Sequence, residues 1–141
     1  MSETRSPRDV FLALVHGVAA RHDPAELAAL YAEQTDVIHP FDPERGPALL
    51  TRDELREHFA LGQSVRRAFD ERKPVDIVIH ETTDPEVIIA EFAYEGRNAN
   101  TGQTVRVPLI FVMRVRDGLI VESRDYADHL AGARAIAAES R

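Results

Sequence analysis

The segment VESRDYADHL (residues 121–130) gathers side chains that can move protons: three acids, an arginine, a tyrosine and a histidine. A carboxyl or imidazole group serves as a general acid or base when its surroundings bring its pKa close to the working pH. A solvated strand end has a similar composition. Which side chains face the interior therefore decides whether this segment can do chemistry, and that depends on the strands around it.

The facing of these residues follows from the turn at residues 116–118, Arg-Asp-Gly, between two strand-like runs. A three-residue loop with its glycine at positive φ sets Val115 opposite Leu119 and Phe111 opposite Ser123. A two-residue loop mixes apolar and charged side chains on one face, so we favour the three-residue loop. One face then holds Leu109, Phe111, Met113, Val115, Leu119, Val121, Ser123 and Asp125.

Asp125 is the only ionised side chain on that face. A carboxylate surrounded by apolar groups loses solvation, which raises its pKa toward the range of a useful base or acid. The alternative is that Asp125 lies at the rim of the sheet and bonds to a helix N-terminus or to water. Glu122 and Arg124 fall on the opposite face, where a structural role is expected.

Histidines supply the second group of candidates. His39 lies in a short predicted strand, DVIHPF (residues 36–41), where it is either a base poised near neutrality or a histidine held by Asp36 or Asp42. His58 precedes Phe59 on a predicted helix, so it either faces a pocket or borders the core. The other histidines are expected to be solvated: His16, His22, His80 and His129.

Metal and cofactor signals are weak in this sequence. There are no cysteines, and no two histidines show the i, i+4 helical spacing or the short strand spacing of a metal site, although a site assembled across strands stays open. Neither a G-x-G-x-x-G motif nor a P-loop is present. We expect no metal and no cofactor. Residues that either form the core or line a pocket for a hydrophobic ligand are Tyr31, Phe41, His58, Phe59, Phe92, Tyr94, Phe111 and Met113.

The order of elements predicts an α+β fold in a single domain, residues 1–141. Three capping patterns, SPRD, DPAE and TRDE, predict helices from Ser6, Asp23 and Thr51. The apolar stripe of the third helix is Leu55, Phe59, Gly62 and Phe69. Strand-like runs follow at residues 75–81, 86–97, 104–115 and 118–128, which predicts an antiparallel meander with helices on one face.

Composition excludes several classes of partner. The net charge of −7 argues against nucleic acid and against anionic lipid. No apolar run reaches the roughly 18 residues of a membrane helix. The N-terminal residues lack the apolar stretch of a signal peptide, so we expect a cytoplasmic protein.

The chain resembles the nuclear transport factor 2-like superfamily, and within it the SnoaL-like domains. The resemblance lies in LAALYAEQTDVIHPFDP, the following helix and meander, and the terminal DGLIVESRDYADHL. The group includes ketosteroid isomerases, polyketide cyclases and limonene epoxide hydrolases. The resemblance implies a cone-shaped, curved mixed or antiparallel sheet (an α+β barrel), about three helices on its concave side, an apolar pocket and a homodimer.

Residue by residue, the resemblance implies a partial site. His39 stands where steroid isomerases carry their base, while their two oxyanion donors fall near Val15 and Phe111. RDYAD is similar to the RDYFD of limonene epoxide hydrolases, which makes Asp125 one member of their water-activating Asp-Arg-Asp set. The other two members fall on the IIAEFAYEG run, at Phe92 and Tyr94. In SnoaL-like cyclases a terminal-strand aspartate is the acid/base, and Asp125 or Asp128 fits that role.

Two functions remain open at this stage. The first is a cofactor-free acid/base catalyst (isomerase, cyclase, dehydratase or hydrolase) for a small hydrophobic molecule, with Asp125 and His39 as its titrating pair. The second is a non-catalytic ligand-binding or dimerisation module of the same fold. The outward sheet face also predicts a homodimer, because it carries an apolar stripe of Val87, Ile89, Ile110, Val112 and Ile120.

Overall fold

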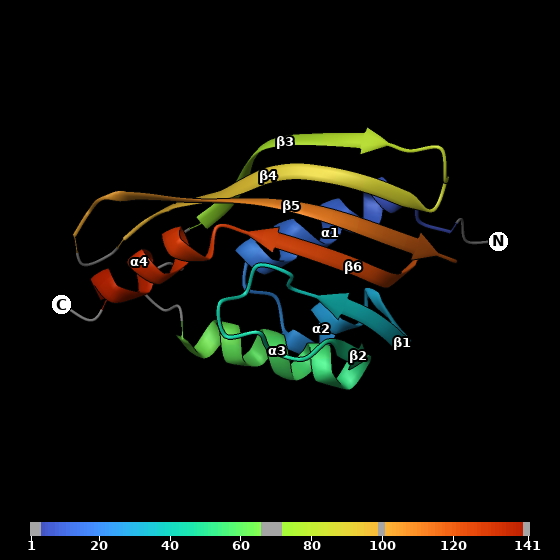
Figure 1. Cartoon of the computed structure of the whole chain (residues 1–141), viewed down its shortest axis with the longest axis horizontal. Coiled ribbons are helices and arrows are strands. Elements are labelled where there is room, and N and C mark those ends of the chain that lie inside the picture. Colours follow the sequence, from blue (N-terminus) through green and yellow to red (C-terminus); the bar gives the residue numbers. More distant parts are fainter. Residues whose placement is uncertain (1–3, 66–71, 99–100, 140–141) are drawn as a thin grey trace.

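Residues 4–65, 72–98 and 101–139 are the part of the chain that the structure, a computed structural model, describes. They form four helices and one six-stranded mixed sheet (Figure 1). The strand order across the sheet is β2-β1-β6-β5-β4-β3. The helices are α1 (Pro7–Ala19), α2 (Pro24–Ala28), α3 (Arg52–Val65) and α4 (His129–Glu139). The strands are β1 (Tyr31–Ile38), β2 (Leu49–Thr51), β3 (Arg72–Glu81), β4 (Val87–Arg97), β5 (Thr104–Arg116) and β6 (Leu119–Ala127).

The three predicted helix starts are confirmed by their capping bonds. The Ser6 hydroxyl accepts a hydrogen bond from the backbone N–H of Asp9 (3.1 Å), and the Thr51 hydroxyl accepts one from Glu54 (3.1 Å). At the start of α2, Asp23 Oδ1 accepts from the N–H of Ala25 (2.8 Å). The predicted stripe of α3 includes Phe69, which lies outside the described residues. Helix α4 and strand β2 were not predicted.

Helix α1 covers the inner face of the sheet and supplies much of the core. Figure 1 shows it behind strands β3 to β6. Its residue Phe11 is fully buried and meets Phe92 of β4 and Phe111 of β5 edge-on, with ring centroids 5.3 and 6.0 Å away. The rings of Phe92 and Phe111 lie 5.1 Å apart. Edge-on packing of this kind adds to the stabilisation that burial of apolar surface provides.

The β5–β6 turn differs from the predicted three-residue loop. It has two residues, Asp117 and Gly118, both at positive φ (53° and 77°), as a type I′ hairpin requires. Pairing then shifts by one residue, so that Val121 is the extra residue of a β-bulge. The two-residue turn pairs Ile120 with the buried Val115, so Ile120 faces inward and is fully buried, although the sequence placed it on the outer face.

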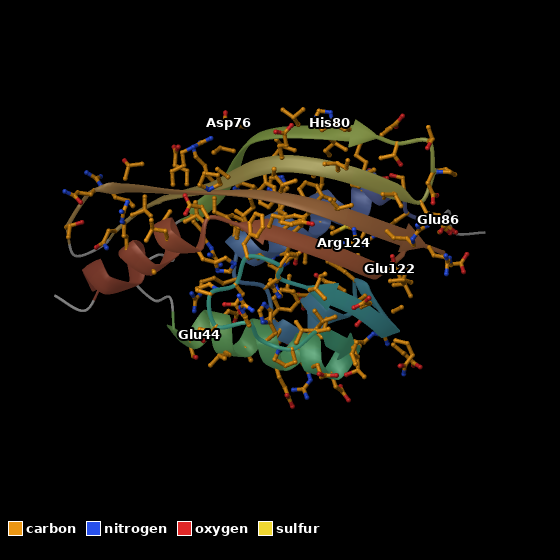
Figure 2. The ribbon with its side chains drawn as sticks, viewed as in Figure 1. Glu44, Asp76, His80, Glu86, Glu122 and Arg124 are labelled. Atoms are coloured by element: carbon orange, nitrogen blue, oxygen red, sulfur yellow. The ribbon has the colours of Figure 1, made fainter. Side chains whose placement is uncertain are left out.

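Beyond the bulge the predicted facing is correct. Met113 pairs with Ser123 and Phe111 pairs with Asp125, and all four side chains are buried. Asp125 therefore lies on the apolar face as predicted, although its partner is two residues along β5 from Leu109, the partner that the three-residue loop implied. Opposite charges occupy the other face, where Glu122 and Arg124 are exposed on β6 with α1 behind the sheet (Figure 2).

Strand β1 makes the sheet mixed, because it runs parallel to β6. Val37 pairs with Ser123, and Ile38 pairs with Arg124. β1 begins at Tyr31, earlier than the predicted residue 36, and it ends at Ile38. His39, which follows β1, and Asp125, which follows Arg124 within β6, are therefore brought to the same end of the β1–β6 pairing.

Within the described ranges, no helix combines the length and the apolar character that crossing a membrane requires.

Candidate active site

Asp125 presents a buried carboxyl group on the inner face of β6, with 8% of its surface exposed. Ser123, two residues earlier on the same strand, points to the same side because strand side chains alternate. The Ser123 hydroxyl donates a short hydrogen bond of 2.5 Å to Asp125 Oδ1. Ser123 thus fixes one carboxyl oxygen and leaves Oδ2 available for other partners.

Burial raises the pKa of Asp125 to about 7, and the hydrogen bond from Ser123 opposes that rise. Desolvation has the larger effect, because a buried carboxylate loses its water while a single hydroxyl restores only part of the solvation. A carboxyl group with a pKa near neutrality can both accept and return a proton at physiological pH.

His39 lies beside this carboxyl group. Its Nε2 is 3.7 Å from Asp125 Oδ2, beyond the range of a direct hydrogen bond. Burial lowers the pKa of His39, nearby His129 lowers it further, and Asp42 acts in the opposite direction. The imidazole is therefore neutral when Asp125 begins to titrate, and the two groups do not form an ion pair at neutral pH. A ligand atom or a water that lies beside the pair can hydrogen-bond to both groups.

Residues from β1 and α3 complete the surroundings of the pair. The exposed ring of His58 lies at a tilt against His39, with centroids 5.2 Å apart, and 5.6 Å from the ring of Phe59. Tyr31 is buried, and its ring is 6.0 Å from Phe59. Burial raises the pKa of the Tyr31 phenol and the nearby Asp125 raises it further, so Tyr31 stays protonated and able to donate a hydrogen bond.

Residues 11–123 match the family model of the SnoaL-like domain, a span that includes both His39 and His58. An uncharacterised PhzA/B-like protein of Pseudomonas aeruginosa is 32% identical over 108 residues, which are 72% of this chain and 74% of that relative. The chain belongs to the SnoaL-like family. Asp125 lies two residues beyond the end of the family match.

Solved structures agree with this family in fold. A Bacillus subtilis protein described provisionally as an isomerase has a TM-score of 0.79 at 21% identity, covering 93% of this chain and 92% of its own. A phenazine biosynthesis-related protein of Pseudomonas aeruginosa has a TM-score of 0.71 at 18% identity, covering 93% and 84%. An epoxide hydrolase/cyclase-like enzyme of pyran ring formation in salinomycin has a TM-score of 0.66 at 15% identity, covering 89% and 92%. These likenesses show the cone-shaped α+β fold that the sequence predicted.

Four of the aromatic and sulfur side chains predicted to line a pocket lie in the core of the SnoaL-like domain. Met113 is fully buried, and Phe92, Phe111 and Tyr94 are at least 93% buried. Tyr94 also lies beneath the guanidinium of Arg72, which is 4.9 Å from its ring centroid. These residues pack against α1 and form the inner wall behind Asp125.

Phe41 does not lie with the others. Its side chain is 67% exposed and meets Tyr126 edge-on, with ring centroids 5.0 Å apart. Both rings border a hollow of about 540 Å³ that is lined mostly by residues of the outer sheet face, among them Val78, Glu91 and Ile110. Phe41 follows His39 by two residues, but the chain has already left β1 there, so strand alternation no longer directs its side chain inward.

Two residues in or near the site were missed by sequence reasoning. Ser123 was placed on the correct face but not linked to Asp125, although their i, i+2 spacing predicts adjacent side chains on a strand. His129 was expected to be solvated, whereas its Nε2 is buried and has no hydrogen-bond partner among the described residues. Helix α4, which was not predicted, places it there.

Asp128, the other aspartate suggested for acid/base work, has a structural role. It is exposed, and its Oδ1 accepts a hydrogen bond from the N–H of Ala131 (3.0 Å) at the start of α4. Of the two aspartates, Asp125 therefore has the geometry for proton transfer. Across residues 4–65, 72–98 and 101–139, no group of three or more histidine and acidic side chains is arranged to hold a metal ion.

Proposed function

We propose that this SnoaL-like protein is a cofactor-free acid/base catalyst that transfers protons within a small, largely apolar molecule, as an isomerase or a cyclase does. The observation that carries the proposal is the 3.7 Å distance between Asp125 Oδ2 and His39 Nε2, since one oxygen or nitrogen atom beside the pair can bond both to a carboxyl group with a pKa of about 7 and to an imidazole. The inner wall of Phe92 and Phe111 supports an apolar substrate.

The proposed reaction balances without an added reactant. The Asp125 carboxylate takes a proton from a C–H or O–H of the substrate, and the resulting carboxylic acid returns it to another atom of the same molecule. His39, neutral at this pH, holds the substrate or a water by a hydrogen bond at Nε2. The similarity in fold to a protein described provisionally as an isomerase and to an epoxide hydrolase/cyclase-like enzyme supports this class of reaction.

A non-catalytic ligand-binding module is the second candidate, and the packing of the interior favours it. Phe11, Phe92 and Phe111 are buried against one another, so they fill the part of the cone behind Asp125. A ligand then has the mouth of the cone, near His39 and His58, as its main binding surface.

Proton exchange in deuterated water distinguishes the two candidates without knowledge of the natural substrate. Cyclohexanone, cyclohexenone and limonene oxide serve as probes, and their NMR spectra report deuterium uptake and ring opening. We expect wild-type protein to accelerate one of these reactions and Asp125→Asn to lower that rate by about 10²–10⁴-fold. Asp36→Asn, an exposed change on β1, is the matched control. Probe binding that is equal in wild type and Asp125→Asn, with no exchange in either, supports the binding module instead.

A further inference from the structure

Asp125 is buried, so a proton that its carboxyl group takes up needs a route to solvent. Only 8% of the residue is exposed, and Oδ1 already accepts a hydrogen bond from Ser123. Deuterium uptake from water by a substrate requires that this proton leave the site and that a deuteron take its place. The groups beside Oδ2 can therefore limit how fast the carboxyl group exchanges with bulk water.

His39 is the first group on such a route. Its Nε2 is 3.7 Å from Asp125 Oδ2, and its side chain is 24% exposed, against 11% for that of Asp125. A movement of about 0.5–1 Å brings the two atoms into hydrogen-bond range. A neutral imidazole accepts a proton at one nitrogen and can then release a proton from the other. His39 can therefore pass a proton outward and return to its neutral form.

His58 extends the route to the surface. It lies on α3, and its ring is tilted by 32° against that of His39, with centroids 5.2 Å apart. Paired rings have centroids about 4.5–7 Å apart, so the two imidazoles are in contact. His58 is exposed, whereas His39 is partly buried and Asp125 is buried. Exposure therefore rises at each step from the carboxyl group to the solvent.

Two other titratable neighbours of His39 are poorer exits. Both carboxylate oxygens of Asp42 accept hydrogen bonds from backbone N–H groups of its own loop. These bonds lower the pKa of Asp42, so it stays ionised near neutrality and carries no proton there. The Nε2 of His129 is inaccessible to solvent. Among these neighbours, His58 therefore has the exposure that a proton exit requires.

We propose that His58 is a positioning residue that acts through His39, carrying protons between His39 and the solvent and so setting how fast the Asp125 carboxyl group exchanges. In the outward direction the O–H bond of the Asp125 carboxylic acid breaks, and an N–H bond forms at Nε2 of His39. His39 releases a proton from its other nitrogen to His58, directly or through one water, and His58 releases one to bulk water. Inward transfer of a deuteron reverses each step.

This inference deepens the proposed function and rests on it for the role of Asp125, but the exchange itself also takes place in a module without turnover. The NMR signal of the Asp125 carboxyl carbon therefore reports it without any substrate. Near the titration midpoint, fast exchange gives one averaged line, and slow exchange gives broadened or separate lines for the two protonation states. We expect one line in wild type and exchange about tenfold slower, or more, in His58→Phe. Each protein is compared at its own midpoint, so that a changed pKa is not taken for a changed rate.

Two substitutions at the exposed position 58 separate proton transfer from ring packing. His58→Phe keeps an aromatic ring against His39 and removes both nitrogens, whereas His58→Ala removes the ring as well. Free imidazole should restore fast exchange in His58→Ala and not in His58→Phe, whose ring fills the position. His16→Phe, an exposed change on α1, should exchange as wild type does.

Exchange that is equally fast in wild type and in His58→Phe overturns the proposal, because it shows that the ring of His58 only packs against His39. Slow exchange in His58→Ala that imidazole leaves unchanged also overturns it. These failures are distinct from failure of the proposed function. Deuterium uptake by a probe molecule that depends on Asp125, with exchange that does not depend on His58, removes only the present inference. Exchange controlled by His58 without uptake by any probe removes only the catalytic role.

Discussion

Asp125 Oδ2 and His39 Nε2 lie 3.7 Å apart just beyond the last residues that β1 and β6 pair in parallel, close enough to bond to one shared atom and too far to bond directly. Burial raises the pKa of Asp125 to about 7 and lowers that of His39 below its ordinary value. As the pH falls, the carboxyl group therefore takes up a proton before the imidazole does. The pair holds one exchangeable proton rather than two fixed opposite charges.

Stability should depend on the charge of Asp125. The folded-state pKa of about 7 exceeds the ordinary value of 3.8, so between these values the folded protein keeps a proton that the unfolded chain releases. The free energy of unfolding contributed by this group therefore falls as the pH rises from about 4 to about 7. Above a pH of about 7, Asp125→Asn should therefore raise the free energy of unfolding by removing the cost of the buried charge, which is on the order of 4 kcal/mol at most.

Urea unfolding at about pH 5 and about pH 8 checks this sign. The asparagine variant should gain relative to wild type at the higher pH and match it more closely at the lower one. Asp36→Asn, on the exposed side of β1, should show no such pH-dependent gain. Destabilisation by Asp125→Asn at the higher pH would contradict a desolvated carboxylate.

Ser123 should hold the pKa of Asp125 below the value that burial alone produces. Its hydroxyl bonds to the carboxylate at 2.5 Å and favours the charged form. Ser123→Ala should therefore raise the pKa of Asp125 above about 7, as followed by carboxyl NMR. In Ser64→Ala, which removes an exposed hydroxyl on α3, the pKa should not change. An equal or lower pKa in Ser123→Ala would show that the hydroxyl bonds elsewhere in solution.

His39 should make the protein less stable on the acid side. Its folded-state pKa is lowered, so the unfolded chain binds a proton first as the pH falls through about 6.5. His39→Gln should reduce the loss of stability between about pH 7 and about pH 5, measured by thermal unfolding. The titratable groups around His39 are Asp42, His58, Asp125 and His129. His16→Gln removes a histidine elsewhere and leaves His39 and these four groups in place, so it is the control. Identical acid sensitivity in His39→Gln and His16→Gln would rule out this role for His39.

We expect the outer sheet face to form a two-fold dimer. Val78 and Ile110 are 49% and 41% exposed there, and Ile89 and Val112 lie on the same face, although Ile120 does not, since it is buried inside. Light scattering should give about twice the chain mass of 15.8 kDa. Ile110→Lys should produce monomer, whereas Leu61→Lys, an equally polar change at a 65% exposed position on α3, should not. A wild-type mass of one chain would exclude the dimer.

Local signals in the sequence predicted most of the fold. Capping residues such as Ser6 and Thr51 act within one helical turn, and the strand runs are long and strongly apolar. The helix starts and the strands could therefore be predicted without knowledge of tertiary contacts. The β-bulge at Val121 was not, because it is selected by the fit of Ile120 into the core rather than by the residues of the turn. Asp125 was placed on the correct face because the extra residue at the bulge offsets the one-residue error in the predicted turn and restores the alternation beyond it.

Long-range contacts explain what was missed. His39 lies beside Asp125 because β1 pairs in parallel with β6, which joins residues far apart in the chain. The family resemblance, rather than residue spacing, identified His39 as a candidate base. His129 comes close enough to His39 to affect its pKa because α4 begins beside β5, where Asp128 bonds to Pro108, and no periodic pattern in the sequence predicts that helix. Phe41 looks like a pocket residue in the sequence but lies outside, since its position depends on how the loop after Ile38 leaves the sheet.

The most direct measurement of the central claim is the NMR titration of the Asp125 side-chain carboxyl group in the native protein, assigned by comparison with Asp125→Asn. A buried acid/base group beside His39 predicts a midpoint at a pH of about 7. It also predicts that the carboxyl signal responds when His39 is replaced by glutamine, because the two groups are 3.7 Å apart. A midpoint near the ordinary value of 3.8 would contradict the account.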